Sequence, residues 1–302
     1  MKTILLFGPT AVGKTELISN LFKSKYEIIN ADSMQVYRGL DVGTAKPSLD
    51  LQNKIKHHLI DIISPTEQFH TGEFLRLADA LVIDISSRAK IPVISGGTAF
   101  YFKNYLYGLP EIPGIDPTVR EVLQKELLKH GIKVLYDKLI KLDPIRAENI
   151  HPNDKYRILR ALEIIQGSGR LQSDFKPKSI LRKGINPLIL GLKRDRGELY
   201  SRINQRVDLM FEEGLISEVK KCLHAGLKES DPGMQGIGYK EFFQMGRRGD
   251  IILTDIKESI KRNSRRYAKR QITFFKSLPG VKWFEPWNIA LIHKEIESYL
   301  AM

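Results

Sequence analysis

A glycine-rich octapeptide lies close to the start of this chain and limits the folds that are open to it. The pattern G-x-x-x-x-G-K-[ST] of phosphate-binding loops is matched by Gly8-Pro9-Thr10-Ala11-Val12-Gly13-Lys14-Thr15. A β-rich apolar run at residues 3–7 precedes this phosphate loop, and a run with helical spacing of apolar residues, 16–22, follows it. Backbone N–H groups and the helix dipole then point at one place, which suits an anion. The sequence therefore predicts a strand–loop–helix unit that binds a diphosphate or triphosphate.

Two side chains of the phosphate loop suit a ligand that is bound together with magnesium. Lys14 supplies a full positive charge, and the Thr15 hydroxyl is placed to hold Mg²⁺. The alternative is a glycine-rich turn that binds nothing, which the complete order of strand, loop and helix disfavours. The loop leaves the identity of the ligand open, and it does not by itself imply phosphoryl transfer.

An acidic residue follows the next expected strand. Residues 26–31 have the pattern of a strand, and Asp32 stands at its carboxyl end. Ligands of open α/β sheets bind at the carboxyl ends of the strands, so we expect Asp32 to face the ligand of the phosphate loop. The alternative is a helix cap or turn cap, which is the commonest role for an aspartate after a strand.

Strand and helix patterns alternate in the first third of the chain and return near its end. Further strands are expected at residues 59–63 and 91–95, with a helix from residue 71 to 88 and another that ends near residue 107. A strand pattern returns at residues 187–192. This alternation is typical of an α/β fold with a parallel sheet.

A helical insertion interrupts this α/β pattern. A proline-rich stretch at 109–117 marks a boundary, and from 116 to about 172 the pattern is helical, with a helix start at His151-Pro152-Asn153-Asp154. A basic linker covers residues 172–184. The sequence predicts a P-loop NTPase-like parallel-sheet core with an all-helical insertion domain. The expected limits of the two core parts and of the insertion are 1–114, 185–302 and 115–184.

The charge of the chain points to a polyanionic partner. Its 302 residues include 48 Lys and Arg against 35 Asp and Glu, a formal net charge of +13. Nucleic acid is the first expectation and an acidic membrane surface the second, whereas added solubility is the alternative. A long helix expected at about 253–276 places Tyr267 and Phe274 on a face suited to the core. Its basic stripe, with almost no interleaved acids, is formed by Arg262, Arg265, Arg266, Lys269 and Arg270.

Composition also excludes several classes of protein. Cys222 is the single cysteine, so no intrachain disulfide can form, and no Cys/His cluster has the spacing of a zinc site. His57 and His58 are expected at a strand edge rather than as metal ligands. No apolar run reaches transmembrane length, and the chain starts directly with a strand instead of a targeting signal. These features predict a cytoplasmic protein.

Three kinds of protein combine a phosphate loop, an acid at the next strand end and a basic surplus. A P-loop kinase would use Asp32 to take a proton from an acceptor hydroxyl. A transferase whose leaving group is pyrophosphate would hold the departing diphosphate in the loop. An RNA-binding protein would use the loop as a nucleotide switch, which leaves Asp32 without a role. Basic helices and a net charge of +13 are hardest to explain for a small-molecule kinase.

Six motifs, in order between residue 3 and about residue 285, resemble the tRNA dimethylallyltransferase family. They are the phosphate loop, Asp32-Ser33-Met34-Gln35-Val36-Tyr37, Gly43-Thr44-Ala45-Lys46-Pro47, Gly96-Gly97-Thr98-Ala99-Phe100-Tyr101, His151-Pro152-Asn153-Asp154 and Tyr267-Ala268-Lys269-Arg270-Gln271-Ile272-Thr273. The resemblance implies a P-loop core with a helical insertion. It also implies Mg²⁺-dependent transfer of a dimethylallyl group, from dimethylallyl diphosphate to N6 of the adenosine just 3′ of the tRNA anticodon.

The resemblance gives individual residues a role. The phosphate loop would bind the diphosphate, with Lys14 neutralising its charge, Thr15 on Mg²⁺ and Arg202 nearby. Asp32 matches the general base that accepts a proton from the adenosine amine during attack. Thr98 matches a threonine close to the target nucleotide and to the leaving group. Lys14, Asp32 and Thr98 are thus the implied catalytic residues.

The partner implied by the resemblance is the anticodon stem-loop of a tRNA. Its target base must leave the stack, and RNA loops are read through splayed bases and phosphates. The implied tRNA contacts are Asp32, Ser33, Met34, Gln35, Thr98, Arg120, Tyr156, Arg157, Ile158, Leu159, Arg160, Gln235, Gly236, Ile237, Gly238, Tyr239 and Lys240. Enzymes that prenylate free adenine nucleotides are the closest alternative, but they need neither the basic surface nor the arginines of the insertion.

The sequence departs from the family pattern at a few positions. Val12 stands where the family usually has serine, which removes a hydroxyl but keeps the backbone N–H. Phe274 replaces a common tryptophan. No Cys/His pair of a zinc finger follows the core, as expected for the short bacterial form. A monomer is expected, because one tRNA needs one active site.

Overall fold

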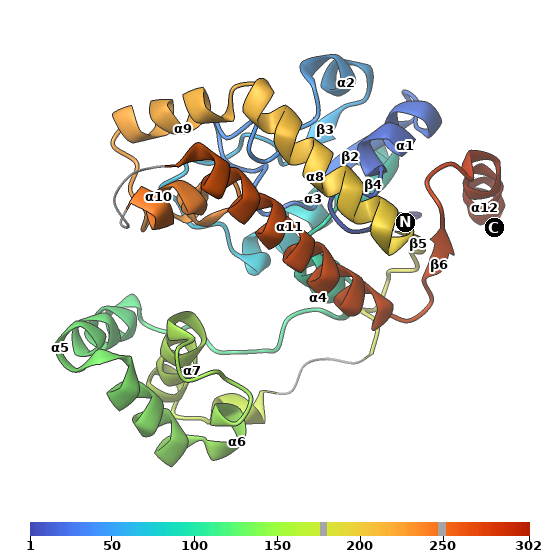
Figure 1. Cartoon of the computed structure of the whole chain (residues 1–302). Coiled ribbons are helices and arrows are strands. Elements are labelled where there is room, and N and C mark those ends of the chain that lie inside the picture. Colours follow the sequence, from blue (N-terminus) through green and yellow to red (C-terminus); the bar gives the residue numbers. More distant parts are fainter. Residues whose placement is uncertain (176–179, 247–251) are drawn as a thin grey trace. The chain divides into compact units, whose positions relative to one another are not determined.

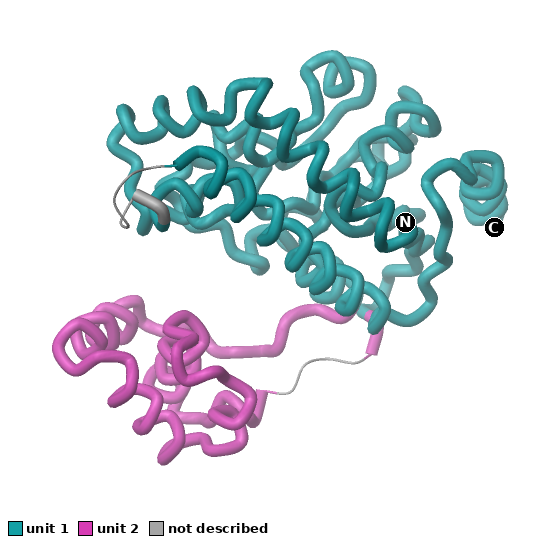
Figure 2. The backbone as a smooth tube through the Cα atoms, viewed as in Figure 1, with its two compact units in different colours: residues 1–106, 182–302 teal, residues 107–181 magenta. Residues whose placement is uncertain are grey.

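The structure is a computed structural model that describes residues 1–175, 180–246 and 252–302. Residues 176–179, which belong to the expected basic linker, therefore lie outside the described residues. The chain forms two compact units, coloured teal and magenta in Figure 2: residues 1–106 with 182–302, and residues 107–181. The first unit is the α/β core, and the second is the helical insertion.

The helical unit begins and ends somewhat earlier in the chain than the expected limits of 115 and 184. A backbone hydrogen bond joins the two core segments where the insertion leaves and returns. It runs from the N–H of Arg182 to the carbonyl oxygen of Leu106 at 2.9 Å. The Arg182 guanidinium also bonds the carboxylate of Asp79, at 2.6 Å and 3.2 Å. These contacts make residue 182 part of the core, and they set the limits of the insertion at 107 and 181.

A six-stranded parallel sheet forms the centre of the core (Figure 1). Its strands, in the order β3-β2-β4-β1-β5-β6, are β1 Ile4–Phe7, β2 Tyr26–Asn30, β3 His57–His58, β4 Ile91–Gly96, β5 Leu188–Leu192 and β6 Lys282–Phe284. Every residue of β1 is buried, and Ile4 aligns with Val93 of β4 on one side and Leu188 of β5 on the other. Since all strands are parallel, the loops that follow β1, β2 and β4 meet at one edge of the sheet.

Helices cover both faces of the sheet. The helices of the core are α1 Lys14–Leu21, α2 Leu49–Lys54, α3 Thr71–Ser87, α4 Ala99–Tyr107, α8 Arg196–Glu212, α9 Leu215–His224, η2 Pro232–Gln235, α10 Lys240–Gly246, α11 Leu253–Lys276 and α12 Ile289–Ala301. One core cluster packs the apolar sides of α1, α8 and α12 against β1, β4 and β5. Among the described residues, no helix combines the length and the apolar character needed to span a membrane.

The face of α11 that enters the core is rotated from the expected one. Phe275 is fully buried and stacks on Phe7 of β1, with ring centroids 4.3 Å apart, whereas Phe274 is half-buried beneath the ammonium of Lys103. Ala268 and Gln271 share the buried face with Phe275, at the helical spacing of three and four residues. The prediction of Phe274 as a core residue was therefore wrong by one position along the helix.

The third strand also differs from its prediction. It covers His57 and His58 at the edge of the sheet, as expected for that pair, and does not extend over residues 59–63. Leu59 and Asp61 have φ values of +63° and +56°. This left-handed backbone interrupts the extended conformation that a strand requires.

The insertion contains only helices among its described residues, in agreement with the prediction. They are α5 Pro117–Leu142, α6 Pro144–Ala147, α7 Lys155–Ser168 and the short η1 Gln172–Asp174. The Asp154 carboxylate accepts a hydrogen bond from the N–H of Arg157, so it caps α7 as the sequence suggested. Leu123, Leu135 and Leu162 belong to a small core of its own, which indicates that the insertion is an independent packing unit.

Candidate active site

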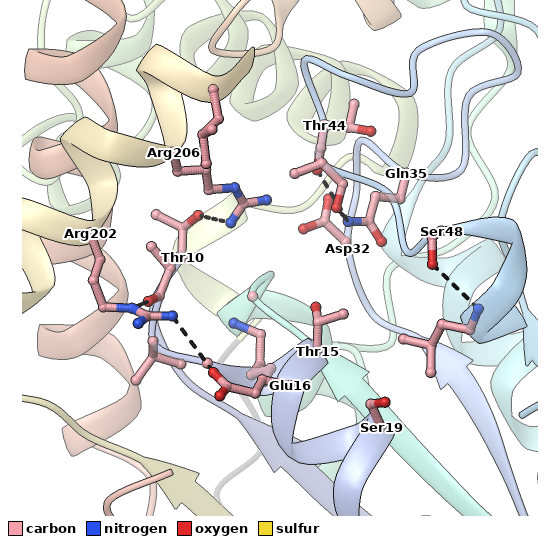
Figure 3. Close-up of a pocket in the computed structure, with 18 of the residues that line it drawn as sticks. Thr10, Thr15, Glu16, Ser19, Asp32, Gln35, Thr44, Ser48, Arg202 and Arg206 are labelled. Carbon is pink, nitrogen blue, oxygen red and sulfur yellow. Dashed lines mark hydrogen bonds and ion pairs between the residues drawn. The ribbon is translucent and has the colours of Figure 1, made fainter. Parts of the chain in front are cut away.

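Two cavities at the carboxyl edge of the sheet bring most of the predicted site residues together. The large cavity, about 850 Å³, is lined by the phosphate loop, by Asp32 and Gln35 after β2, and by Arg202 and Arg206 of α8 (Figure 3). The small cavity measures about 320 Å³. Residues that line both cavities are Thr10, Asp32, Thr44, Arg206 and Tyr267. The two cavities therefore meet beside Asp32.

The phosphate loop joins β1 to α1 through two positions that require glycine. Gly13 has a φ of +115°, and it precedes the first helical residue without a capping side chain. A Cβ atom on Gly8 would lie 2.9 Å from the carbonyl oxygen of Leu192. Because no side chain caps α1, its first N–H groups remain available to an anion in the large cavity.

Lys14 lies over the backbone of the phosphate loop. Its ammonium group donates to the carbonyl oxygens of Gly8, at 2.8 Å, and Pro9, at 2.9 Å. Burial lowers the pKa of Lys14 to about 7, and the positive charge of Arg206 lowers it further, while the Asp32 carboxylate opposes both effects. An anion in the large cavity would favour the protonated ammonium, because its negative charge would offset the hydration that the ammonium loses on burial.

Two arginines one turn apart on α8 reach the same loop. Nε of Arg202 donates to the carbonyl oxygen of Ala11 at 3.0 Å, and its guanidinium lies 3.8 Å from the Glu16 carboxylate. Arg206 donates to the Thr10 hydroxyl at 3.1 Å, and burial lowers its pKa. The prediction included Arg202 and omitted Arg206. The spacing of four residues, which places both side chains on one helix face, is the signal that could have revealed it.

Asp32 caps a turn and also lines both cavities. Its Oδ1 accepts a hydrogen bond from the N–H of Met34 at 2.9 Å, so it does cap a turn. Within the described part of the chain this is its only hydrogen bond, which leaves Oδ2 available to a ligand. Thr98 lines neither cavity, but its Oγ1 accepts from the N–H of Ser33 at 2.9 Å and donates to the Ser33 hydroxyl. Thr98 therefore fixes the backbone next to Asp32.

The donor groups in the large cavity fit a magnesium ion that accompanies a phosphate ligand. The described residues contain no cluster of three or more His, Cys, Asp or Glu side chains that could hold a metal alone. Mg²⁺ commonly needs only one or two protein oxygens, since phosphate oxygens and water complete its six ligands. The Thr15 hydroxyl lines the large cavity and forms no hydrogen bond with any described residue, so it can serve as such an oxygen.

The small cavity has walls from three parts of the chain. Ser33, Met34, Gly43 and Thr44 form one wall, and a second wall is formed by Gln235, Gly236, Ile237 and Lys240. From α8 and α11 come Ile203, Val207, Met210, Ile260, Ser264 and Arg270. Six of the predicted contacts therefore line this cavity next to Asp32. Its mixture of apolar side chains and a few polar groups is typical of a site for a flat organic ligand.

Besides Thr98, three predicted contacts of the core lie outside the small cavity. Gln35 lines the large one, and its amide donates to the carbonyl oxygens of Thr44 and Ala45, at 3.1 Å each. Gly238 lines neither cavity, and Tyr239 is fully buried. The Tyr239 hydroxyl donates to the Glu218 carboxylate at 2.7 Å, so its side chain supports the loop from inside rather than facing a ligand.

The remaining predicted contacts lie in the helical unit. Tyr156 and Arg157 at the start of α7 are exposed, and Arg120 is half-buried. Arg160 pairs with the carboxylate of Glu163 at 2.9 Å. Ile158 is fully buried in the core of the unit, with Leu159 packed against it. The implied contact through Ile158 does not fit its position, because a helix that buries every third or fourth residue leaves only the intervening side chains outside.

Comparisons with known proteins agree with this geometry. Residues 35–278 match the family model described as IPP transferase. The chain is 42% identical over 286 residues to a tRNA dimethylallyltransferase of Geobacter sulfurreducens, which covers 94% of this chain and 92% of the relative. It is 41% identical over 303 residues to the tRNA dimethylallyltransferase of Bacillus subtilis, and this match covers 99% of this chain and 96% of the relative.

Solved structures extend the likeness to the fold. The crystal structure of a tRNA isopentenylpyrophosphate transferase from Bacillus halodurans aligns with a TM-score of 0.70 and 39% identity, over 99% of this chain and 97% of the other. The crystal structure of a eukaryotic dimethylallyltransferase acting on tRNA aligns with a TM-score of 0.74 and 30% identity. The alignment covers 94% of this chain and 74% of the other. The parallel sheet, the phosphate loop and the family match lead to one conclusion: this chain belongs to the IPP transferase family, with its P-loop NTPase-like fold.

Proposed function

We propose that this protein transfers a dimethylallyl group from dimethylallyl diphosphate to N6 of the adenosine just 3′ of a tRNA anticodon. The products are N6-dimethylallyladenosine in the tRNA and diphosphate. One observation carries the proposal: the phosphate loop and Asp32 line the same cavity, and a second cavity meets it at Asp32. A diphosphate and an acceptor base can thus approach a single carboxylate from two sides.

The large cavity suits the diphosphate half of the reaction. Lys14, Arg202 and Arg206 bring three cationic side chains to the loop, where the first N–H groups of α1 also point. These groups would hold both phosphates of the substrate and stabilise the negative charge of diphosphate as it leaves. Magnesium, held through the Thr15 hydroxyl and the phosphate oxygens, would neutralise further charge on the leaving group. Stabilising this charge should be the larger contribution, because the allylic carbon tolerates partial positive charge.

The small cavity suits the acceptor half. As the new C–N bond forms, the C–O bond to the diphosphate breaks and its electron pair leaves with the phosphate oxygen. The N6 amine must then lose a proton, and we assign Asp32 Oδ2 as the acceptor. Apolar side chains such as Met34, Ile237 and Met210 would contact the flat face of an adenine that has left its stack.

Exposed basic residues on α7 and α11 support an RNA acceptor. Tyr156, 61% exposed, and its neighbour Arg157 offer a ring and a charge on α7 of the helical unit. On α11, Arg262, Arg266, Lys269 and Arg270 are exposed, and Arg270 also reaches the small cavity. All the residues that line the two cavities belong to one chain, so we further propose that a single copy acts on each tRNA. We also propose that the enzyme is cytoplasmic.

The proposal is tested by incubating the protein with Mg²⁺ and radiolabelled dimethylallyl diphosphate. The acceptors are an anticodon stem-loop with adenosine after the anticodon, the same stem-loop with guanosine there, and free AMP. Label in the adenosine stem-loop alone supports the proposal. Label in AMP instead would assign the protein to the free-nucleotide enzymes, and ATP consumption without any transfer of label would favour a kinase.

A further inference from the structure

The carboxylate of Glu218 binds two loops at once. Glu218 lies on α9, and its Oε2 accepts hydrogen bonds from the N–H groups of Asp41 and Val42, both at 2.8 Å. Its Oε1 accepts from the N–H of Gly43 at 3.0 Å and from the Tyr239 hydroxyl at 2.7 Å. Among the described residues Glu218 has no basic partner. Three backbone donors and one hydroxyl therefore satisfy this charge, and all of them belong to two loops that are far apart in sequence.

Both loops are packed tightly, against each other and against the segment that follows Asp32. A Cβ atom on Gly43 would lie 2.5 Å from the ring of Tyr239, and one on Gly236 would lie 2.4 Å from the Met34 side chain. The first loop continues to Thr44, whose carbonyl oxygen accepts a hydrogen bond from Gln35. Each loop therefore has little room to shift without moving the segment that follows Asp32.

The residues that Glu218 joins are neighbours of the cavity walls. Gly43 and Thr44 belong to one wall of the small cavity, and residues 235–237 belong to the other. Glu218 itself lines neither cavity. Removing its carboxylate would leave three backbone N–H groups and the buried Tyr239 hydroxyl without their acceptor. The loops would then separate or rearrange to reach water, because Gly43 and Tyr239 are buried and a buried donor without a partner is costly.

We propose that Glu218 is a positioning residue that sets the width of the acceptor pocket, by fixing residues 41–43 and Tyr239 against each other. The proposal rests on the proposed function, since it takes the small cavity as the acceptor pocket. It predicts that Glu218 controls binding of the RNA and leaves binding of the diphosphate substrate unchanged, because no residue of the phosphate loop contacts Glu218.

The test compares Glu218→Ala, Glu218→Gln and the control Glu212→Ala. Glu212 is an exposed carboxylate at the end of α8 that contacts no partner among the described residues. Glutamine has the same shape, and its oxygen can accept from the N–H groups of Asp41 and Val42, but its NH₂ group cannot accept from the Gly43 N–H or the Tyr239 hydroxyl. We expect Glu218→Ala to raise the KM for the stem-loop about tenfold or more, and Glu218→Gln to raise it about threefold. The KM for dimethylallyl diphosphate should stay within about twofold in all variants.

A direct measurement of RNA binding separates this inference from the proposed function. The affinity of a fluorescent stem-loop is measured by anisotropy without dimethylallyl diphosphate, and thermal denaturation reports folding. Weaker RNA binding in Glu218→Ala, partial recovery in Glu218→Gln and no change in Glu212→Ala support the inference. Equal RNA affinity in Glu218→Ala and wild type would overturn it, even if the reaction proceeds as proposed. If Glu218→Ala does not fold, Glu218→Gln decides by the same criterion. A wild-type protein that binds the stem-loop but transfers no label would contradict the proposed function alone.

Discussion

Gln271, in the middle of α11, accepts a hydrogen bond from the backbone N–H of Thr10 in the phosphate loop, at 2.9 Å. Its Nε2 donates to the carbonyl oxygen of Gly97 at 2.7 Å, and the side chain is buried. One amide therefore connects the loop after β1 to the loop after β4. The phosphate loop is held in place by a residue more than 250 positions further along the chain.

Substitution of this amide should disturb the phosphate loop before it disturbs the RNA site. Gln271→Leu keeps most of the volume but leaves the Thr10 N–H and the Gly97 carbonyl without partners. We expect a loss of about 2 kcal/mol in the free energy of unfolding and a higher KM for dimethylallyl diphosphate. Urea denaturation and steady-state kinetics measure the two effects. An unchanged KM for the diphosphate substrate, with lower stability, would show that the link is only structural.

Arg206 should matter for diphosphate binding as much as the predicted Arg202 does. Arg206→Ala removes a half-buried positive charge and the hydrogen bond to Thr10. We expect the affinity for dimethylallyl diphosphate to fall about tenfold or more, as measured by isothermal titration calorimetry. Arg196→Ala is the matched control, because Arg196 is an exposed arginine on the same helix that contacts the Tyr200 ring instead. Equal affinity in Arg206→Ala and in this control would contradict the assignment.

Binding of diphosphate should be coupled to proton uptake at Lys14. Burial lowers the pKa of this ammonium to about 7 in the absence of an anion. A bound diphosphate raises the pKa again, so between about pH 7 and pH 10 the complex holds a proton that the free protein has lost. Calorimetry with inorganic diphosphate at pH 8, in buffers of different ionisation enthalpy, should show uptake of nearly one proton. Lys14→Met should lose this uptake, and wild-type protein that binds diphosphate without it would refute the coupling.

The stability of the sheet edge should depend on pH through Glu27. This buried carboxylate on β2 accepts from Arg88 at 2.5 Å and 2.8 Å, contacts His58 at 2.8 Å and pairs with Lys90 at 2.9 Å. The Arg88 hydrogen bonds lower its pKa far below the usual range. Its contribution to stability is therefore fully present above about pH 4.3, the ordinary pKa of glutamate, and is lost as the pH falls further toward the folded value.

Glu27→Gln should accordingly destabilise the protein by about 2 kcal/mol at pH 7, and the difference from wild type should shrink in acid. Urea denaturation at pH 7 and at pH 3.5 provides the comparison. Glu73→Gln, which removes an exposed partner of Arg76 on α3, should change stability little at either pH. An equal effect of Glu27→Gln at both pH values would show that charge is not the source of its contribution.

Local motifs predicted the parts of the site that lie within a few residues of a strand end. The phosphate loop and Asp32 follow β1 and β2 directly, so the parallel order of the strands was enough to bring them together. Arg206, Gln271 and Glu218 were not predicted. Gln271 and Glu218 each act through a partner that is distant in sequence, and no pattern in a single sequence reveals such a pairing, whereas the helical spacing from Arg202 could have revealed Arg206.

The errors in the fold have a related cause. The left-handed backbone at Leu59 and Asp61 confined the third strand to His57 and His58. Leucine does not signal this conformation, and aspartate adopts it only occasionally. On α11 two phenylalanines stand side by side, and only packing against Phe7 decides that Phe275 is buried. The spacing of apolar residues identifies the buried face of a helix only to within about one residue. The error on α11, Phe274 instead of Phe275, is of this size.

The most direct measurement is the mass of the nucleosides released from the stem-loop after reaction with wild-type protein and with Asp32→Asn. Wild type should produce N6-dimethylallyladenosine at the position after the anticodon. Asp32→Asn should bind inorganic diphosphate with little change, yet form this product about a hundredfold more slowly or worse, because its amide cannot accept the N6 proton. Equal rates in the two proteins would contradict Asp32 as the base, and a prenyl group on another atom or on no nucleoside would contradict the proposed reaction.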